Sequence, residues 1–109
     1  DEFKRLCVSL KEGDTMLALK KIGATRLIKN EFYDKVKAAE DSGASAEQMK
    51  ELLGKGRAKR GIFEGDLVEG ELEIGQIASL LKDLPPAKEA LGQIVEEYNE
   101  KVKASFDIF

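Results

Sequence analysis

Apolar residues recur every three or four positions through most of this chain, and this spacing constrains its fold more than any other feature. Such a stripe covers one face of an α-helix and turns that face toward a core. The stripes predict helices over 1–12, over about 26–41, after Ser45, around 74–81 and from 86 onward. Thr15–Leu19 lacks the spacing and is expected to be extended. The predicted fold class is mostly α, with about five helices, one short extended segment and the stripes as core.

Local signals at the ends of these segments support the assignment. Ser45 and Gln48 have the spacing of a capping box, in which a hydroxyl and a side-chain amide satisfy free amides at a helix start. Gly13 and Gly54 follow helical stripes and are expected to end them. Pro86 suits the first turn of the last helix, because a proline there loses no hydrogen bond.

Residues 56–76 read GRAKRGIFEGDLVEGELEIGQ, with glycines at 56, 61, 65, 70 and 75. This is not a phosphate-binding P-loop, because Ile62 and Phe63 stand where Lys and Ser or Thr would be required. A dinucleotide fingerprint is also excluded, since the third glycine and a preceding strand are missing. The residues alone indicate a compact connector built on the conformational freedom of glycine. A helix start at Gly75–Gln76, with free amides facing a polar ligand, is the alternative.

The chain contains no histidine, which removes the commonest general base and the commonest metal ligand. Zinc sites and serine triads are therefore not expected. The acidic run from Glu64 to Glu73 lacks the alternation of oxygen ligands that a calcium loop needs. The sequence thus predicts no metal site and offers no catalytic residue.

Charge divides the sequence into two halves of opposite sign. Residues 1–63 hold 14 Lys and Arg against 10 Asp and Glu, whereas residues 64–109 hold 4 against 11. The only basic cluster comprises Lys55, Arg57, Lys59 and Arg60. No aromatic residue lies within it to stack on bases, so nucleic-acid binding is disfavoured. We expect a solvated turn whose cations meet the acidic residues that follow.

Length and composition set the remaining expectations. A chain of 109 residues with 42% hydrophobic and 36% charged residues would form one small domain. No apolar run is long enough to span a bilayer, and no signal peptide is present. The single cysteine, Cys7, lies on a helical stripe and is expected to be a buried thiol, which favours a cytoplasmic setting. Because the sequence starts at Asp1 with a stripe already under way, we expect a fragment of a longer protein.

Several segments resemble one family of flavoenzymes. Phe63–Asp66, Glu69–Gly70 and Gly75–Ala78 are similar to the C-terminal signature of the NAD(P)H-dependent flavin oxidoreductases. This family comprises the nitronate monooxygenases, formerly 2-nitropropane dioxygenases, and enoyl-acyl-carrier-protein reductase II. Glu12–Thr15, Thr25–Asn30 and Gly54–Gly61 also read like the final third of such a protein. The resemblance covers essentially the whole chain.

The resemblance implies the C-terminal part of a (β/α)8 TIM-barrel flavoprotein that binds FMN, with residues 1–12 as the last barrel helix. Residues 13–109 would be a helical extension packing over the barrel mouth. FMN would be held mainly by residues outside this chain, and NAD(P)H would be the co-substrate. The resemblance carries no catalytic residue over to this sequence. The residues it places nearest the flavin or substrate pocket are Gly70, Gly75, Gln76, Glu64 and Asp66.

The implied function is transfer of hydride from NAD(P)H through flavin to an enoyl-acyl-carrier-protein in fatty acid biosynthesis, or oxidation of nitronates. The expected partners are the remainder of the barrel, a second copy in a homodimer, and acyl carrier protein. The carrier protein would dock on the cluster formed by Lys55, Arg57, Lys59 and Arg60. The alternative from the residues alone is a non-catalytic helical interaction module, with the two charged halves as docking surfaces.

Overall fold

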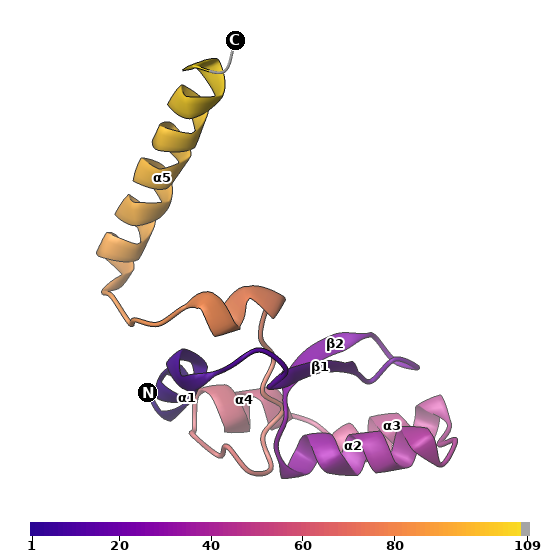
Figure 1. The fold of residues 1–109 in the computed structure, drawn as a ribbon. Helices are drawn as coiled ribbons and strands as arrows, with labels where there is room; N and C mark the ends of the chain where they lie inside the picture. The colour runs from indigo at the N-terminus through magenta and orange to yellow at the C-terminus, as the bar shows by residue number, and fades with distance from the viewer. Residues whose placement is uncertain (108–109) are drawn as a thin grey trace.

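The structure is a computed structural model that describes residues 1–107, and helices dominate it (Figure 1). Its elements are, in chain order, α1 (Glu2–Ser9), β1 (Thr15–Ala18), β2 (Thr25–Ile28), α2 (Glu31–Asp41), α3 (Ala46–Leu53), α4 (Arg57–Ile62), the 3-10 helix η1 (Gln76–Leu80) and α5 (Ala87–Asp107). The prediction of a mostly helical chain is confirmed, and the expected extended segment is β1. The strand β2 and the helix α4 were not predicted.

β1 and β2 form an antiparallel hairpin in which Thr15 lies opposite Ile28. The sequence prediction that a helix begins near residue 26 is therefore wrong. Ile28 belongs to the strand ladder, and a helical spacing to later apolar residues does not reveal this long-range pairing. The helix α2 begins only after Asn30, whose side-chain oxygen accepts a hydrogen bond from the Tyr33 backbone amide at 2.9 Å.

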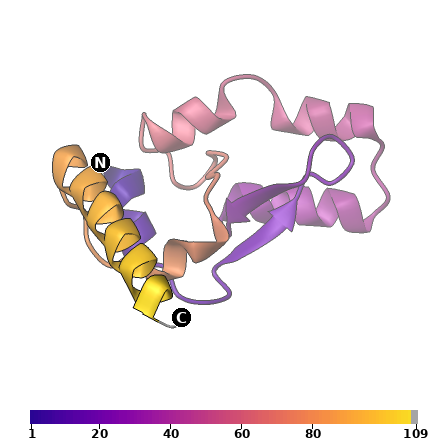
Figure 2. The ribbon, with the colours of Figure 1, turned by 90° about the horizontal axis from the view of Figure 1, so that it is seen from above.

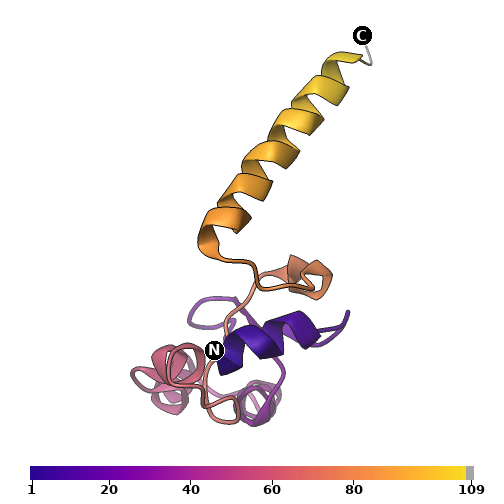
Figure 3. The same cartoon turned by 90° about the vertical axis from the view of Figure 1, so that its left-hand side faces the viewer.

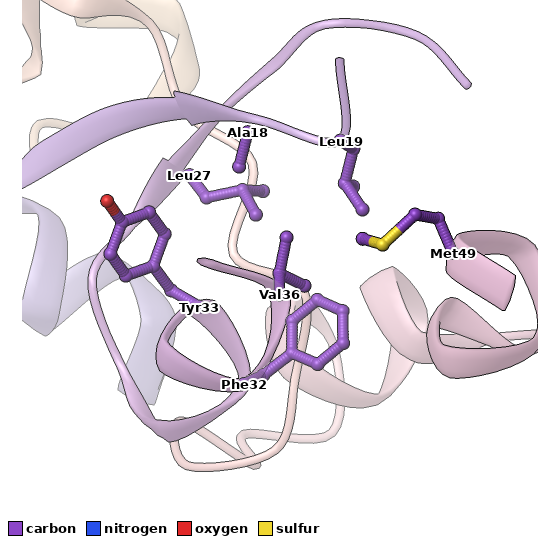
Figure 4. Packing of buried hydrophobic residues seen from close by; sticks show 7 residues of the cluster. All are labelled: Ala18, Leu19, Leu27, Phe32, Tyr33, Val36 and Met49. Atoms are coloured by element: carbon purple, nitrogen blue, oxygen red, sulfur yellow. The ribbon is translucent and has the colours of Figure 1, made fainter. Parts of the chain in front are cut away.

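The larger core cluster lies between the hairpin and the helices α2 and α3 (Figure 4). Its buried members are Ala18, Leu19, Leu27, Phe32, Tyr33, Val36 and Met49. The predicted capping box at the start of α3 is confirmed, since the Gln48 amide donates to the Ser45 hydroxyl and the Gln48 side chain accepts from the Ser45 amide. This cap fixes where α3 begins and so brings Met49 over the core.

A second cluster joins α1 to η1. It contains Leu10, Ile28, Leu72 and Ala78, with Phe3, Leu6, Cys7, Leu67 and Ile74 packed against it. The Cys7 thiol is free and half-buried, and burial raises its pKa. The segment around residue 73 also pairs with the hairpin, since the Ile28 amide donates to Leu72 O at 2.9 Å and the Ile74 amide donates to Arg26 O at 3.1 Å. The end of the glycine-rich segment is thereby fixed against β2.

Two glycines of the 56–76 segment are needed for close backbone contact. A Cβ on Gly70 would lie 2.3 Å from Gly61 Cα and 2.4 Å from Asp66 O, so neither approach leaves room for a side chain. The segment between them turns at Gly65, whose φ is +83°. These features support the interpretation of the segment as a compact connector, although its first part forms the short helix α4.

α5 extends away from the remaining elements in both side views (Figures 1 and 3). None of its described residues is buried, and its apolar stripe, Leu91, Ile94, Val95 and Tyr98, is 59–67% exposed. The radius of gyration of 17.6 Å exceeds the value of about 13 Å typical of a compact domain of this size. The prediction that this stripe is core is therefore wrong within this chain, because no described element covers it.

Candidate functional site

A groove of about 730 Å³ opens between the loop that leads into β1 and the helix η1. Small-molecule sites commonly have volumes of about 300–1,000 Å³. The lining residues come from three segments: Lys11, Glu12, Gly13, Thr15 and Met16 from the loop and β1, Arg26 from β2, and Gln76, Ile77, Ser79 and Leu80 from η1. Figure 2 shows η1 beside the hairpin when the molecule is seen from above. Cationic, polar and apolar side chains therefore meet in one concave surface.

Arg26 is held in place by both its backbone and its side chain. It lies in β2, and its carbonyl accepts the hydrogen bond from the Ile74 amide. Its Nη1 donates to the Thr15 hydroxyl at 3.1 Å across the hairpin. Among residues 1–107, no carboxylate lies within 4.0 Å of the half-buried Arg26 guanidinium. The groove thus contains a positioned cation whose remaining donors face no anion of the described chain.

The opposite wall of the groove is attached to the body through the middle of η1 and through a residue just beyond its C-terminal end. Ala78 is buried in the second core cluster, and the Lys82 ammonium donates to the carbonyl of Leu10 at 2.8 Å. Ile77 and Leu80 point outward and are 62% and 73% exposed. The prediction of a helix around 74–81 is correct in place, but the helix is short and of the 3-10 type. This tight turn presents two large apolar side chains on the groove side.

The structure separates the five residues that the family resemblance placed nearest the pocket. Gln76 lines the groove, and Gly75 directly precedes it. Gly70 is buried against Gly61, and Glu64 is exposed in the turn after α4. Asp66 stabilises that turn, because its carboxylate accepts from the amides of residues 68 and 69 and pairs with Arg60. Of the five, only Gln76 therefore lines the groove, with Gly75 next to it in the chain, and proximity of any of the five to flavin remains a prediction.

The basic cluster is not a uniform exposed patch. Arg57 points inward, where its guanidinium donates to the carbonyls of Leu53, Glu69 and Leu52 at 2.7, 2.8 and 3.1 Å. It also lies 4.3 Å from the centroid of the Phe32 ring. Arg60 pairs with Asp66 at 2.6 Å, which agrees with the expectation that these cations meet the following acidic residues. Lys55 and Lys59 are exposed to solvent.

Glu71 is the one described charged residue that is buried, with 7% of its surface exposed. Burial raises the pKa of its carboxyl to about 7, and the neighbouring carboxylate of Glu73 acts in the same direction, whereas Arg57 opposes it. The pKa of Asp66 is lowered, chiefly by the hydrogen bond from the Glu69 amide. The acidic run therefore contains carboxyl groups in very different environments.

Within residues 1–107, the acidic and sulfur-bearing side chains form no group of three or more that could hold a metal ion. The same part of the chain contains no helix long and apolar enough to cross a membrane.

That Arg26 and Thr15 line the groove was not predicted from the sequence. The alternation in Thr25–Ile28, where Arg26 separates threonine and leucine, is the signal for a strand that could have revealed them.

The glycine-rich segment resembles that of the flavin oxidoreductases, and comparison with solved structures finds similar structures. The structure of FabK from Thermotoga maritima matches with a TM-score of 0.81 and 28% sequence identity over 99% of this chain and 34% of that chain. Its M276A mutant matches with a TM-score of 0.75 and 24% identity, over 99% of this chain and 31% of that chain. No family model matches the sequence, and no curated protein matches it.

The chain spans about a third of the length of these FabK structures. The match extends over nearly all of this chain, so α5 takes part in it together with the groove. The resemblance to the family that contains enoyl-acyl-carrier-protein reductase II is therefore confirmed.

Proposed function

We propose that this chain is the C-terminal part of an FMN-dependent oxidoreductase that reduces enoyl-acyl-carrier-protein with NAD(P)H in fatty acid biosynthesis. The observation that carries this proposal is the match to FabK over 99% of the chain at a TM-score of 0.81. FabK is an enoyl-acyl-carrier-protein reductase, and this favours enoyl reduction over nitronate oxidation for this chain. A stand-alone interaction module is less well supported, because a free α5 would leave its apolar stripe in water.

The exposed stripe of α5 supports a larger assembly. The match to FabK covers 99% of this chain and so includes α5, although none of the described residues of this helix is buried here. A helix that packs against nothing has no fixed direction, so we infer that the remainder of a TIM barrel covers the stripe. In this arrangement residues 1–12 form the last barrel helix, and residues 13–109 form the extension over the barrel mouth. The soluble barrel would carry out its reaction in the cytoplasm.

The glycines of this chain do not form a loop for the phosphate of FMN. The glycines that could form a phosphate loop serve other purposes, since Gly61 and Gly70 allow a backbone contact and Gly56 and Gly65 adopt positive φ in turns. Residues outside this chain would therefore hold the flavin, which supplies hydride transfer when bound. The contribution of this chain is the groove, whose apolar side chains would exclude water and orient the substrate.

The test uses the full-length protein that carries this sequence. We expect it to purify with the visible absorption spectrum of bound flavin and to oxidise NAD(P)H when an enoyl thioester is supplied. The same preparation should show little turnover with a nitronate. A colourless protein, or turnover of nitronates without reduction of enoyl thioesters, would overturn the proposal.

Docking of acyl carrier protein is a second part of the proposal, and α4 offers the surface for it. Lys55 and Lys59 are exposed, whereas Arg57 is occupied internally and Arg60 is paired with Asp66. Reversal of charge in the double variant Lys55→Glu, Lys59→Glu should raise the KM for the carrier-bound substrate several-fold and leave that for a small thioester unchanged. Equal KM values for both proteins with the carrier-bound substrate would exclude this surface.

A further inference from the structure

We propose that the groove between the hairpin and η1 binds a phosphate group through Arg26 and an attached, less polar part of the same ligand through Ile77 and Leu80. The phosphate belongs either to the pyridine nucleotide or to the phosphopantetheine arm that carries an acyl group. This inference rests on the proposed function for those two sources. That the groove binds a phosphate group and an apolar part of the same ligand is inferred from its side chains alone.

The two half-buried arginines of the described chain differ in how many of their donors are used. The guanidinium of Arg57 donates through Nε, Nη1 and Nη2 to three carbonyl groups and lies over an aromatic ring. The guanidinium of Arg26 makes one described hydrogen bond, from Nη1 to the Thr15 hydroxyl. A guanidinium has five N–H donors, and a cation shielded from water is costly unless an anion faces it. Arg26 therefore has donors available for a ligand in a position where one is favourable.

The Arg26 side chain is held in a fixed orientation at the groove. Arg26 belongs to the lining of the groove, together with the Thr15 hydroxyl that orients it. A guanidinium recognises phosphate with two parallel N–H donors, so a fixed orientation adds selectivity. Lys11 adds a second positive charge to the groove, and Glu12 is the one carboxylate that lines it. The net charge of the lining is positive, which favours an anion.

The groove also offers apolar surface for the rest of the ligand. Met16, Ile77 and Leu80 line the same groove and are 46%, 62% and 73% exposed. Ser79 and Gln76 place a hydroxyl and an amide between these apolar surfaces. An inorganic ion would leave the apolar side chains in water, whereas an elongated phosphate ester would cover them. The mixed lining therefore fits a phosphate carried on a longer organic molecule.

The binding experiment uses the full-length protein and does not depend on turnover. Inorganic pyrophosphate is titrated into the wild-type protein, Arg26→Gln, Arg26→Lys and the control Arg5→Gln by calorimetry. Arg5 is an exposed arginine on α1 that pairs with Glu2 and lies outside the groove lining. We expect the affinity to fall about tenfold in Arg26→Gln, less in Arg26→Lys, and not at all in the control. Equal affinities in wild type and Arg26→Gln would overturn the proposal.

The kinetic experiment identifies the source of the phosphate. KM values of the wild-type protein and of Arg26→Gln are measured for NAD(P)H, for an enoyl thioester of phosphopantetheine, and for the same enoyl group on N-acetylcysteamine, which has no phosphate. A KM in Arg26→Gln that is about tenfold higher than in wild type for the nucleotide alone assigns the groove to NAD(P)H. A rise for the phosphopantetheine thioester alone, with the N-acetylcysteamine thioester unchanged, assigns it to the acyl carrier arm. No change for any phosphate-bearing substrate would overturn the inference.

These two experiments separate the failure of this inference from the failure of the proposed function. Loss of pyrophosphate binding in Arg26→Gln, in a protein that reduces no enoyl thioester, would retain the phosphate subsite and reject the enzyme assignment. Active enoyl reduction with unaltered pyrophosphate binding would reject the subsite alone. Thermal unfolding of each variant serves as the folding control, because Arg26→Gln also removes the hydrogen bond to Thr15.

Discussion

Gly70 lies against the backbone of Gly61 so closely that an added Cβ would come within 2.3 Å of Gly61 Cα. We therefore predict that Gly70→Ala lowers the free energy of unfolding by about 2–3 kcal/mol, since backbone atoms on both sides must move. Gly75→Ala is the matched control, because its Cβ would meet no atom within 4 Å and its φ is −85°. Chemical denaturation of the purified protein measures both, and equal losses would contradict the close contact.

Arg57 is predicted to act as a structural residue. Arg57→Met keeps much of the packing against Phe32 but leaves the three carbonyl groups without this donor. We expect a loss of about 2–3 kcal/mol of unfolding free energy. Lys59→Met, two positions further along α4 at an exposed site, should change stability by less than about 0.5 kcal/mol. An Arg57→Met protein as stable as the Lys59→Met protein would show that these hydrogen bonds make no net contribution to the free energy of unfolding.

Stability should fall with rising pH because of Glu71. Its pKa is raised to about 7 in the folded protein from a usual value of 4.5, so the folded state binds this proton more tightly than the unfolded state. The contribution of Glu71 is fully present below about pH 4.5 and is lost as the pH rises through about 7. Glu71→Gln should remove this decline and stabilise the protein at pH 8, whereas Glu64→Gln, in an exposed position, should leave the profile unchanged. Denaturation midpoints from pH 4.5 to 8 measure this, and parallel profiles for wild type and Glu71→Gln would contradict it.

The apolar stripe of α5 provides a prediction about the full-length protein. Ile94→Asp places a charge in the middle of the stripe, and Gln93→Asp places the same charge on the opposite side of the helix. If the remainder of the barrel covers the stripe, Ile94→Asp should lower the unfolding free energy by about 3 kcal/mol or more. Gln93→Asp should have little effect. Equal stabilities of the two variants would mean that the stripe stays exposed in the whole protein.

The isolated chain of 109 residues should behave differently from the full-length protein. Without a surface to cover α5, we expect it to aggregate or to unfold over a broad temperature range. Calorimetry checks this directly. A sharp two-state transition would instead favour the independent helical module.

Local signals in the sequence were sufficient for part of the fold. The Ser45–Gln48 capping box and the extended Thr15 segment are formed by neighbours in the chain, and both predictions are confirmed. The strand at Ile28 was predicted as helix because its partner lies thirteen positions earlier, and spacing within one segment does not reveal such pairing. The stripe of α5 was assigned to the core because periodicity shows which face is apolar and not what covers it.

The groove depended even more on contacts between distant segments. Gln76 was singled out by family resemblance, and it does line the groove. Arg26 has no distinctive sequence motif, and its importance follows only from the Thr15 contact and the absence of a carboxylate among the described residues nearby. Gly70 was predicted by family resemblance to lie near the flavin or substrate pocket, but its role in the structure is a backbone contact with Gly61. Sequence resemblance thus located the segment, whereas packing determined what each residue does.

The β-bridge between Leu27 and Glu73 fixes the register of the segment that follows it, so the number of residues between Glu73 and Gln76 cannot change freely. This pairing continues the hairpin, so Ile74 is turned into the second core cluster and Gln76 into the groove. One residue inserted between 73 and 76 would reverse which side chains face inward. An insertion in the exposed turn at 63–64 would lengthen only a surface loop. Natural length variation in relatives should therefore be frequent at that turn and absent from the four residues that end at Gln76.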